Sequence, residues 1–370
     1  MRGIKIALLI LIMMGFAGCY GRVPIEGLAV LAGTGNDLEK EANNKFKNTI
    51  EFFVFKEEDK IERTVITVNS ETAYTAYEKR QIKMKKNPLV GTIRAYVIGE
   101  ERAKYGIGDL LDTFIRDQER NLNTVMVVCK GKAEDIFMLN PVENSTISED
   151  IKSELQSSIN SYFLTREMEI KDVFNMYYQE GRRIMIPYIE ADRGKYVDTV
   201  KISGIAVFEK DKMIFMIPIE EAKYINLIRN SNSKGYLSLV NENDRTKSTD
   251  LFCTSKRKVK VSMENDKLIY DINIDIKAEN KMNTAGSEGE PSENNIEMIA
   301  KKIEKQTEDR LKETIARVKQ KYGVDVFDIE KYAIAKLGRD KEEFIKDSFK
   351  NSIINVNVNV KIISTGRLQN

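Results

Sequence analysis

The sequence contains no histidine and no tryptophan, and it has only three cysteines and six prolines among its 370 residues. Without histidine, the chain cannot build a Ser-His-Asp or Cys-His catalytic arrangement, a histidine proton shuttle, an HExxH zinc site or a histidine-ligated haem. The cysteines, Cys19, Cys129 and Cys253, form neither a CxxC pair nor the four ligands of a structural zinc. We therefore expect no metal and no cofactor.

An excess of charge of one sign is also missing. The chain has 59 Lys and Arg against 57 Asp and Glu, and its hydrophobic fraction of 42% is too high for a disordered chain. At roughly 100 to 200 residues per domain, the length allows two or three domains. The balanced charge gives no reason to expect a nucleic-acid partner.

The first 18 residues have the pattern of a secretory signal peptide. Arg2 and Lys5 form a basic head, and residues 6–16 form an apolar run of 11 residues. A membrane-spanning helix needs about 20 apolar residues, so this run is too short to span. Removal of residues 1–18 would leave 352 residues and lower the net charge from +2 to zero.

The residues around Cys19 resemble the lipobox of bacterial lipoproteins. In a lipobox, small residues precede a cysteine that receives a diacylglyceryl group and becomes the N-acylated first residue. Ala17 and Gly18 supply the small residues, although Phe16 stands where leucine is usual. We expect Cys19 to carry lipid that holds the protein on a membrane. An ordinary cleavage site beside a chance Gly-Cys pair is the alternative.

Strand and helix patterns alternate between residues 19 and 196. The candidate strands are 28–35, 49–55, 65–68, 93–98, 125–129 and 184–189. Two short helices between the strands at 93–98 and 125–129 indicate a crossover and a partly parallel sheet. Gly33 and Gly35 predict a turn that ends the first strand, and Pro187 predicts an edge strand. We expect an N-terminal α/β domain over residues 19–196.

From residue 197 onward the apolar period changes to two. Hairpins are expected over 200–217 and 259–276, and a final strand over 354–362. Residues 278–295 are polar and contain glycine and proline, as in a linker, and 296–322 predict a long amphipathic helix. Residues 197–370 are therefore expected to form a C-terminal α/β region, which the 278–295 linker could split in two. The fold class expected is mixed α/β (α+β), multi-domain, with mixed sheets flanked by helices and with antiparallel strands in the C-terminal region.

Two cysteines remain beside Cys19. Cys129 and Cys253 each follow apolar residues in a candidate strand, which is typical of buried free thiols. A disulfide between them is the alternative. We expect free thiols because the two residues lie in different predicted domains.

Acidic residues gather around the helix expected over 107–116. Two carboxylates could perform acid-base chemistry as in glycosidases, so a hydrolase acting through Asp109 or Asp117 is one hypothesis. Arg116 and Arg120 lie between these acids, and such a mixture is more typical of helix caps and surface ion pairs. We therefore expect a protein that is not an enzyme.

Several segments resemble the Ger(x)C spore germination lipoproteins. Residues 18–37 are similar to the opening pattern GCWDRxEIxELAxVxGxGID, with Tyr20 in place of tryptophan. Residues 97–120 follow the pattern IGEExAxxGIxDxLDxxxRDxExR more closely, and 204–213 and 356–366 resemble two later motifs. The resemblance extends along the whole chain, but no proline or tryptophan occurs over 337–349, where the family pattern has them.

The resemblance implies the C subunit of a nutrient germinant receptor, needed for nutrient-triggered spore germination. Such a subunit is a lipoprotein on the outer face of the spore inner membrane that assembles with membrane A and B subunits. We expect a partner-facing or structural role for eight residues of the second motif: Gly99, Glu100, Glu101, Gly106, Asp109, Asp112, Arg116 and Asp117. The alternative is a solute-binding lipoprotein that captures a small-molecule germinant in a cleft between its domains.

Overall fold

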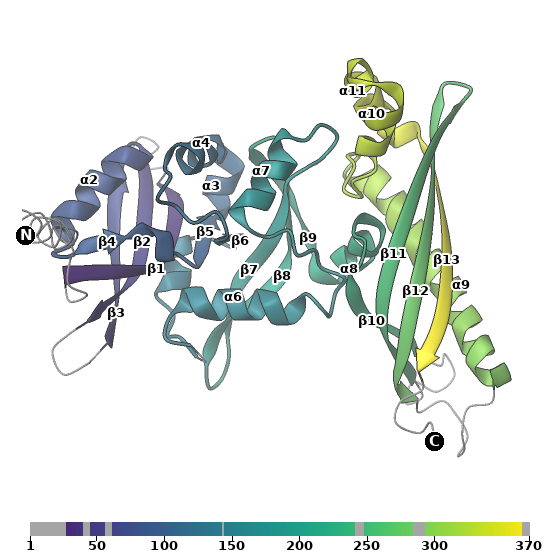
Figure 1. Cartoon of the computed structure of the whole chain (residues 1–370), viewed down its shortest axis with the longest axis horizontal. Helices are drawn as coiled ribbons and strands as arrows, with labels where there is room; N and C mark the ends of the chain where they lie inside the picture. The colour runs from purple at the N-terminus through teal and green to yellow at the C-terminus, as the bar shows by residue number, and fades with distance from the viewer. Residues whose placement is uncertain are drawn as a thin grey trace, which may run out of the picture.

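The computed structural model describes residues 27–39, 45–55, 61–142, 144–240, 248–283 and 293–364. Nine strands form a first sheet: β1 (Leu28–Glu39), β2 (Lys45–Phe55), β3 (Ile61–Ser70), β4 (Asn87–Leu89), β5 (Ala95–Gly99), β6 (Val125–Cys129), β7 (Met185–Arg193), β8 (Asp198–Glu209) and β9 (Lys212–Pro218). Four strands form a second sheet: β10 (Lys234–Val240), β11 (Ser248–Glu264), β12 (Lys267–Asn283) and β13 (Ile353–Ser364). The two sheets follow one another along an elongated molecule (Figure 1).

The first sheet is mixed, with the strand order β3-β2-β1-β5-β6-β7-β8-β9 and β4 paired with β1. Its centre, β1-β5-β6-β7, is parallel, and antiparallel strands extend it on both sides. The second sheet has the order β10-β11-β12-β13, antiparallel except for the parallel pair β12-β13. The fold class is therefore α+β with two mixed sheets, as the sequence predicts.

Helices cover both faces of the first sheet. They are α2 (Ala73–Lys83), α3 (Glu100–Tyr105), α4 (Gly108–Arg116), α5 (Ala133–Phe137), α6 (Ile147–Ser158) and α7 (Ile170–Tyr178). Alternate residues of a strand point to opposite faces. Tyr96 and Ile98 of β5 therefore join a core with α3, α4 and α7, whereas Val97 joins the core that contains α5 and α6. The predicted crossover is confirmed, because α3 and α4 connect the parallel strands β5 and β6.

The turn predicted at Gly33 and Gly35 is wrong. Strand β1 continues through both glycines to Glu39. A side chain at Gly33 would collide with Ser148 of α6, and a Cβ on Gly35 would lie only 2.9 Å from the Cβ of Ala133 in α5. These glycines allow two helices to pack directly on the backbone of the strand, a long-range cause that the local sequence does not show.

The edge position predicted for the strand with Pro187 is also wrong. Strand β7 lies between β6 and β8. Its pairing with β6 is limited to Tyr188 and Ile189, so Pro187 lies outside that ladder and its missing N–H group costs no bond there. Strand β7 then pairs with β8 across the turn at 194–197. The domain boundary expected near residue 196 stays a prediction, while the sheet itself continues past it to Pro218.

The second half contains the other described α-helices: α8 (Ile219–Arg229), α9 (Glu293–Lys321), α10 (Glu330–Leu337) and α11 (Glu342–Ser348). The long helix α9 lies along the second sheet (Figure 1). Its glutamates also cover the β13 edge, because Glu308 Oε1 accepts from Val358 N at 2.9 Å and Glu304 Oε1 from Val360 N at 2.8 Å. Bonding these N–H groups protects an edge that could otherwise pair with another chain.

Most of the second-half pattern is confirmed. Strands β11 and β12 form the hairpin predicted over 259–276, and β13 is the predicted final strand. The hairpin predicted over 200–217 also forms, but it belongs to the first sheet as β8 and β9. Of the expected linker, residues 278–283 lie in β12, and residues 284–292 lie outside the described residues.

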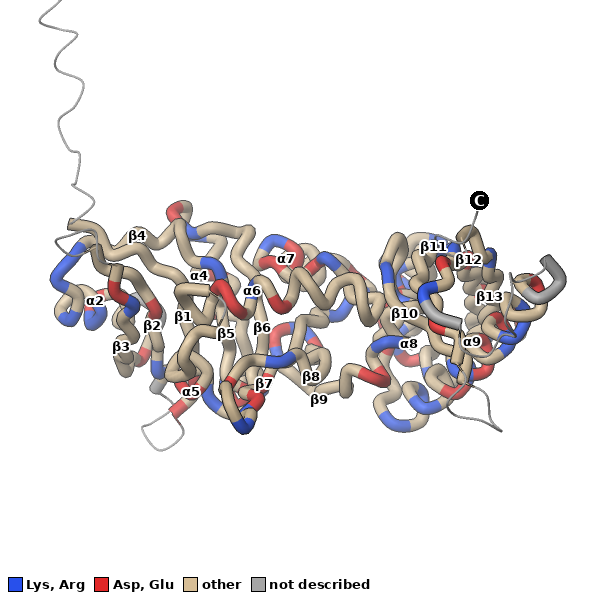
Figure 2. Tube along the Cα trace, turned by 90° about the horizontal axis from the view of Figure 1, so that it is seen from below, with Lys and Arg blue, Asp and Glu red and all other residues tan. Residues whose placement is uncertain are grey.

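Basic and acidic residues are interspersed along both halves (Figure 2). This distribution matches the nearly equal numbers of the two charges in the sequence. Within the described ranges, no helix combines the length and the apolar character needed to cross a membrane.

Phe163 joins the two sheets. Its side chain is fully buried, and its N–H donates to the carbonyl of Lys234 in β10 at 2.8 Å. The ring lies against Gly235, where a Cβ would be only 2.6 Å from two ring carbons. The same apolar core contains Leu155 of α6 and Leu237 of β10, so it is continuous between the halves.

Replacement of Gly235 by valine should therefore destabilise the junction. Insertion of a branched side chain into a filled core costs about 1 to 3 kcal/mol. We expect Gly235→Val to lower the free energy of unfolding by that amount in urea denaturation. Ser238→Val, at an exposed position of the same strand, is the control. Equal stability of the two variants would show that Phe163 does not fill the space over Gly235.

Candidate functional site

The motif around residues 99–117 begins where β5 passes into α3. Gly99 is the N-cap of α3, and a Cβ at this position would collide with the carboxylate of Asp37. That carboxylate accepts hydrogen bonds from Ala133 N at 2.7 Å and Glu134 N at 3.0 Å, at the start of α5. Burial raises the pKa of Asp37 to about 6, although the two N–H groups oppose the rise. Glycine is therefore required for β1, β5 and α5 to meet.

Arg102 is the centre of the motif, and sequence reasoning missed it. The side chain is fully buried, and Nε donates to Asn36 Oδ1 at 2.7 Å. The other guanidinium nitrogens donate to the carbonyl of Gly106 and to the carboxylate of Asp109, and the group lies 4.3 Å from the ring centre of Phe46. One cation thus ties the α3–α4 turn to β1 and β2. No local pattern indicates this, because a single arginine among charged residues is typical of an exposed helix face.

Other motif residues contact more distant segments. Gly106 has φ +133°, and a Cβ there would lie 2.7 Å from Asp211 Oδ2 in the β8–β9 turn. Asp211 also accepts hydrogen bonds from Ile107 N at 2.9 Å and Gly108 N at 3.3 Å. The carboxylate of Glu100 accepts from the Tyr188 hydroxyl of β7 at 2.8 Å. The motif therefore joins segments of the first sheet from β2 to the β8–β9 turn.

The remaining motif residues lie at the surface. Arg116 and Asp112 form an i,i+4 ion pair at 2.9 Å, with side chains 77% and 58% exposed. Asp117 pairs with Arg120 at 2.8 Å, and Glu101 pairs with Lys104 at 3.2 Å. The exposed members leave the partner-facing role as a prediction. Within the described ranges, no group of three or more Cys, Asp and Glu residues could hold a metal ion.

The cysteines lie in different environments. Cys19 is outside the described residues. Cys129 and Cys253 are buried free thiols, which confirms the prediction and rules out the alternative disulfide. Burial raises the pKa of both thiols, that of Cys253 to about 12, so neither is a thiolate at neutral pH.

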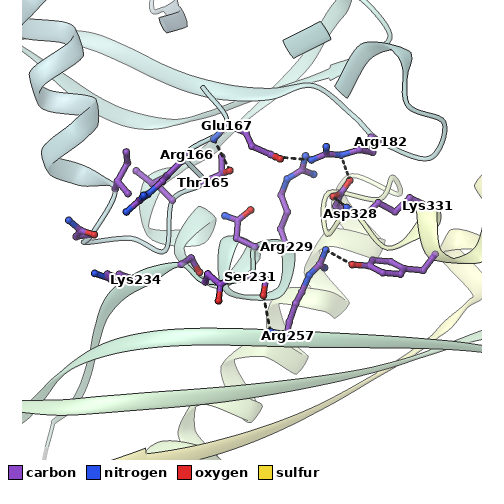
Figure 3. Close-up of a pocket in the computed structure, with 17 residues that line it drawn as sticks. Thr165, Arg166, Glu167, Arg182, Arg229, Ser231, Lys234, Arg257, Asp328 and Lys331 are labelled. Carbon is purple, nitrogen blue, oxygen red and sulfur yellow. Dashed lines mark hydrogen bonds and ion pairs between the residues drawn. The ribbon is translucent and has the colours of Figure 1, made fainter. Parts of the chain in front are cut away.

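A second feature, which no motif indicates, is a cleft at the junction of the two halves (Figure 3). Its volume is about 700 Å³. The walls come from the segment after α6 (159–167), Arg182, the α8–β10 connection (229–234), Arg257 of β11 and the segment 328–332 at the start of α10. The cleft therefore exists only where both halves come together.

Four arginines meet beside this cleft, and we call them the arginine clasp: Arg182, Arg183, Arg229 and Arg257. All except Arg183 line the cleft. The four arginines bind segment 325–330, which is irregular up to residue 329 and enters α10 at Glu330, through its carbonyl and carboxylate oxygens. The bonds are Arg182 Nε to Asp328 Oδ1 at 3.0 Å, Arg183 Nη1 to Glu330 Oε2 at 3.0 Å and to Asp325 O at 3.3 Å, Arg229 Nη1 to Val326 O at 3.4 Å, and Arg257 Nη1 to Phe327 O at 3.0 Å. Asp325 meanwhile accepts from the N–H groups of Phe327, Ile329 and Glu330.

The acids of segment 325–330 respond to the clasp in opposite ways. Burial would raise the pKa of Asp328, but Arg229, Arg182 and Lys331 outweigh it and lower the pKa to about 2. Burial and the neighbouring Asp325 raise the pKa of Glu330 to about 8, against the effect of Arg183. Asp328 is therefore ionised at neutral pH, whereas the neighbouring pair of Glu330 and Asp325, whose pKa values are both raised, favours a protonated form.

Two family models match successive parts of the chain. The model of the spore germination protein N-terminal domain covers residues 21–191, and the spore germination B3/GerAC-like C-terminal model covers residues 203–366. The chain belongs to the GerAC-like family of spore germination proteins, which confirms the resemblance found in the sequence.

Known relatives support this assignment. The chain is 20% identical over 333 residues to spore germination protein B3 of Bacillus subtilis, covering 87% of this chain and 86% of that protein. It is 22% identical over 226 residues to the B. subtilis protein YfkR, covering 57% of this chain and 56% of that protein. The crystal structure of the GerBC protein matches with a TM-score of 0.54 and 14% identity, over 90% of this chain and 97% of GerBC, which shows a shared fold.

Removal of Arg102 should destabilise the first sheet. Arg102→Met leaves the Asn36 and Gly106 oxygens without their buried donor, and the expected loss is about 2 to 3 kcal/mol in the free energy of unfolding. The measurement is urea denaturation. Arg116→Met, which breaks only the exposed pair with Asp112, should leave the midpoint unchanged. Equal effects of the two variants would contradict a central role for Arg102.

The proton on Glu330 should make stability depend on pH. The unfolded chain releases this proton near pH 4.5, whereas the folded protein keeps it to about pH 8. Stability should therefore fall as pH rises from about 5 to 7, by up to about 1.4 kcal/mol per pH unit. Glu330→Gln keeps an acceptor for Arg183 and removes the titration, so its urea midpoint should fall less over this range. Parallel pH profiles of the wild type and Glu330→Gln would contradict the assignment.

Proposed function

We propose that this chain is the lipid-anchored C subunit of a nutrient germinant receptor. In this proposal, acylated Cys19 holds it at the outer face of the spore inner membrane, where it assembles with membrane A and B subunits. The role is needed for nutrient-triggered germination and includes no catalytic step. The observation that carries the proposal is that N-terminal and C-terminal spore germination models match one chain in order over residues 21–366.

The position of Cys19 indicates which end would face the bilayer. Strand β1 begins at Leu28, nine residues after Cys19, and nine residues span at most about 30 Å when extended. The β1–β3 end of the molecule would therefore lie near the membrane. The second sheet lies at the opposite end (Figure 1). Anchoring would also raise the effective concentration of a weak docking surface toward membrane partners.

The absence of a catalytic step is supported by the acids of the motif. The carboxylates of Asp109, Asp112 and Asp117 each form an ion pair with an arginine. A general acid or base needs access to a substrate proton, and these acids are already bonded within the motif. A hydrolase acting through Asp109 or Asp117 is therefore the weaker hypothesis.

The anchor should be removed by Cys19→Ala. We expect this variant to lose metabolic labelling with palmitate, to leave the spore membrane fraction and to weaken nutrient-triggered germination, because a protein without acyl chains has no stable membrane attachment. Cys129→Ala removes a buried thiol instead and should keep both the label and the membrane location.

Assembly is tested by affinity purification of the tagged chain from detergent-solubilised spore membranes. Co-elution of a polytopic membrane protein and a second receptor subunit is the expected result. A chain that elutes alone, from spores whose germination is unaffected by Cys19→Ala, would overturn the proposal and favour the solute-binding alternative.

A further inference from the structure

The cleft at the junction has an excess of positive charge. Six basic and two acidic side chains line it: Arg166, Arg182, Arg229, Lys234, Arg257 and Lys331, with Glu167 and Asp328. Both acids are already occupied, because Arg182 pairs with Glu167 at 2.8 Å and with Asp328 at 3.0 Å, and Lys331 also pairs with Asp328. The other four cations have no carboxylate partner among the residues that the structure describes.

Two of these four cations are fixed in place by the protein. Arg229 is 4% exposed, and its guanidinium bonds to the neutral carbonyls of Val326 at 3.4 Å and Arg183 at 3.2 Å. Arg257 donates to the carbonyls of Ile228 at 2.7 Å and Phe327 at 3.0 Å. Asp328, Asp325 and Glu167 act on Arg229 only through space and form no ion pair with it, so its burial remains costly and lowers its pKa. An anion in the cleft would reduce this cost further.

The other two cations are available to a ligand. Arg166 is exposed and Lys234 is half-buried, and neither side chain forms a hydrogen bond or ion pair with the described residues. Arg166 comes from the segment after α6, and Lys234 comes from the start of β10. Figure 3 shows both on the side of the cleft away from the Arg182–Asp328 pair. Positive charge therefore reaches the cleft from both halves of the molecule.

The size of the cleft and its uncharged lining residues define the ligand further. A volume of about 700 Å³ is in the range of small-molecule sites, which extends from about 300 to 1,000 Å³. Ile159, Leu164 and the ring of Tyr332 add apolar surface, while Asn160 and Ser231 add polar groups. A single small ion would leave most of this space empty and would not reach all four cations.

We propose that the cleft binds a small organic anion with two or more carboxylate or phosphate groups, held by Arg166, Arg229, Lys234 and Arg257. Arginine matches both kinds of group through paired N–H donors. Because the ligand would bridge the two halves, its binding also stabilises their relative orientation. This site is independent of the lipid anchor and of the receptor assignment.

The test is calorimetric titration of the purified full-length chain with citrate and, separately, with inorganic pyrophosphate. We expect saturable one-to-one binding of at least one probe, a raised melting temperature in its presence, and no binding of glycerol. Saturable binding of citrate alone would show that the cleft binds carboxylate groups. Saturable binding of pyrophosphate alone would show that it binds phosphate groups. Cys19→Ala should bind in the same way, so failure of the receptor proposal and failure of this one can be distinguished.

Charge-matched variants test the location. Arg166→Gln combined with Lys234→Gln should weaken binding at least tenfold, since each removed cation takes away a charge-assisted hydrogen bond. Lys258→Gln combined with Lys260→Gln removes the same charge from exposed positions of β11 outside the cleft and should leave the affinity unchanged. Equal weakening by the two pairs, or no binding of either probe to the wild type, would overturn the proposal.

Discussion

The arginine clasp is the interaction on which the arrangement of the two halves depends. Segment 325–330 leads into the first residue of α10 and is buried, yet it belongs to no strand. Buried backbone groups need hydrogen-bond partners, and a segment outside a sheet must find them among side chains. Arg183, Arg229 and Arg257 supply donors to its carbonyls, while Asp325 accepts from its N–H groups. The first sheet and the second half are thereby joined through polar bonds beside the apolar core around Phe163.

The clasp also explains why a cleft exists at the junction. An apolar filling would remove water from the cations that line it, and only two carboxylates are present to compensate them. Desolvation of a charge costs several kcal/mol unless it is paired. Water in an open cleft, or a bound anion, avoids that cost. The same residues that fasten segment 325–330 therefore prevent the junction from closing over them.

Sequence periodicity predicted most of the elements, because alternating and helical patterns report directly on burial. The hairpin over 259–276 and the long helix near 296–322 are examples. The errors have tertiary causes. Gly33 and Gly35 lie within a strand on which the distant helices α5 and α6 pack. Pro187 can lie in an interior strand because β6 pairs only with the next two residues of β7, Tyr188 and Ile189. Local sequence contains neither contact.

The candidate site shows the same limit more strongly. The sequence pattern indicates the motif residues. Arg102, which binds them together, lies at a position that no sequence pattern marks. The cleft cations are spread between residues 166 and 331, and arginine and lysine in sequence usually indicate solvent exposure. Only the fold shows that Arg229 is buried without an ion pair to a described residue and that it shares a cleft with Arg257. The motif and the cleft are thus different kinds of site. The first is a local pattern that fixes the packing of one sheet, and the second is a charge excess that arises only when two halves meet.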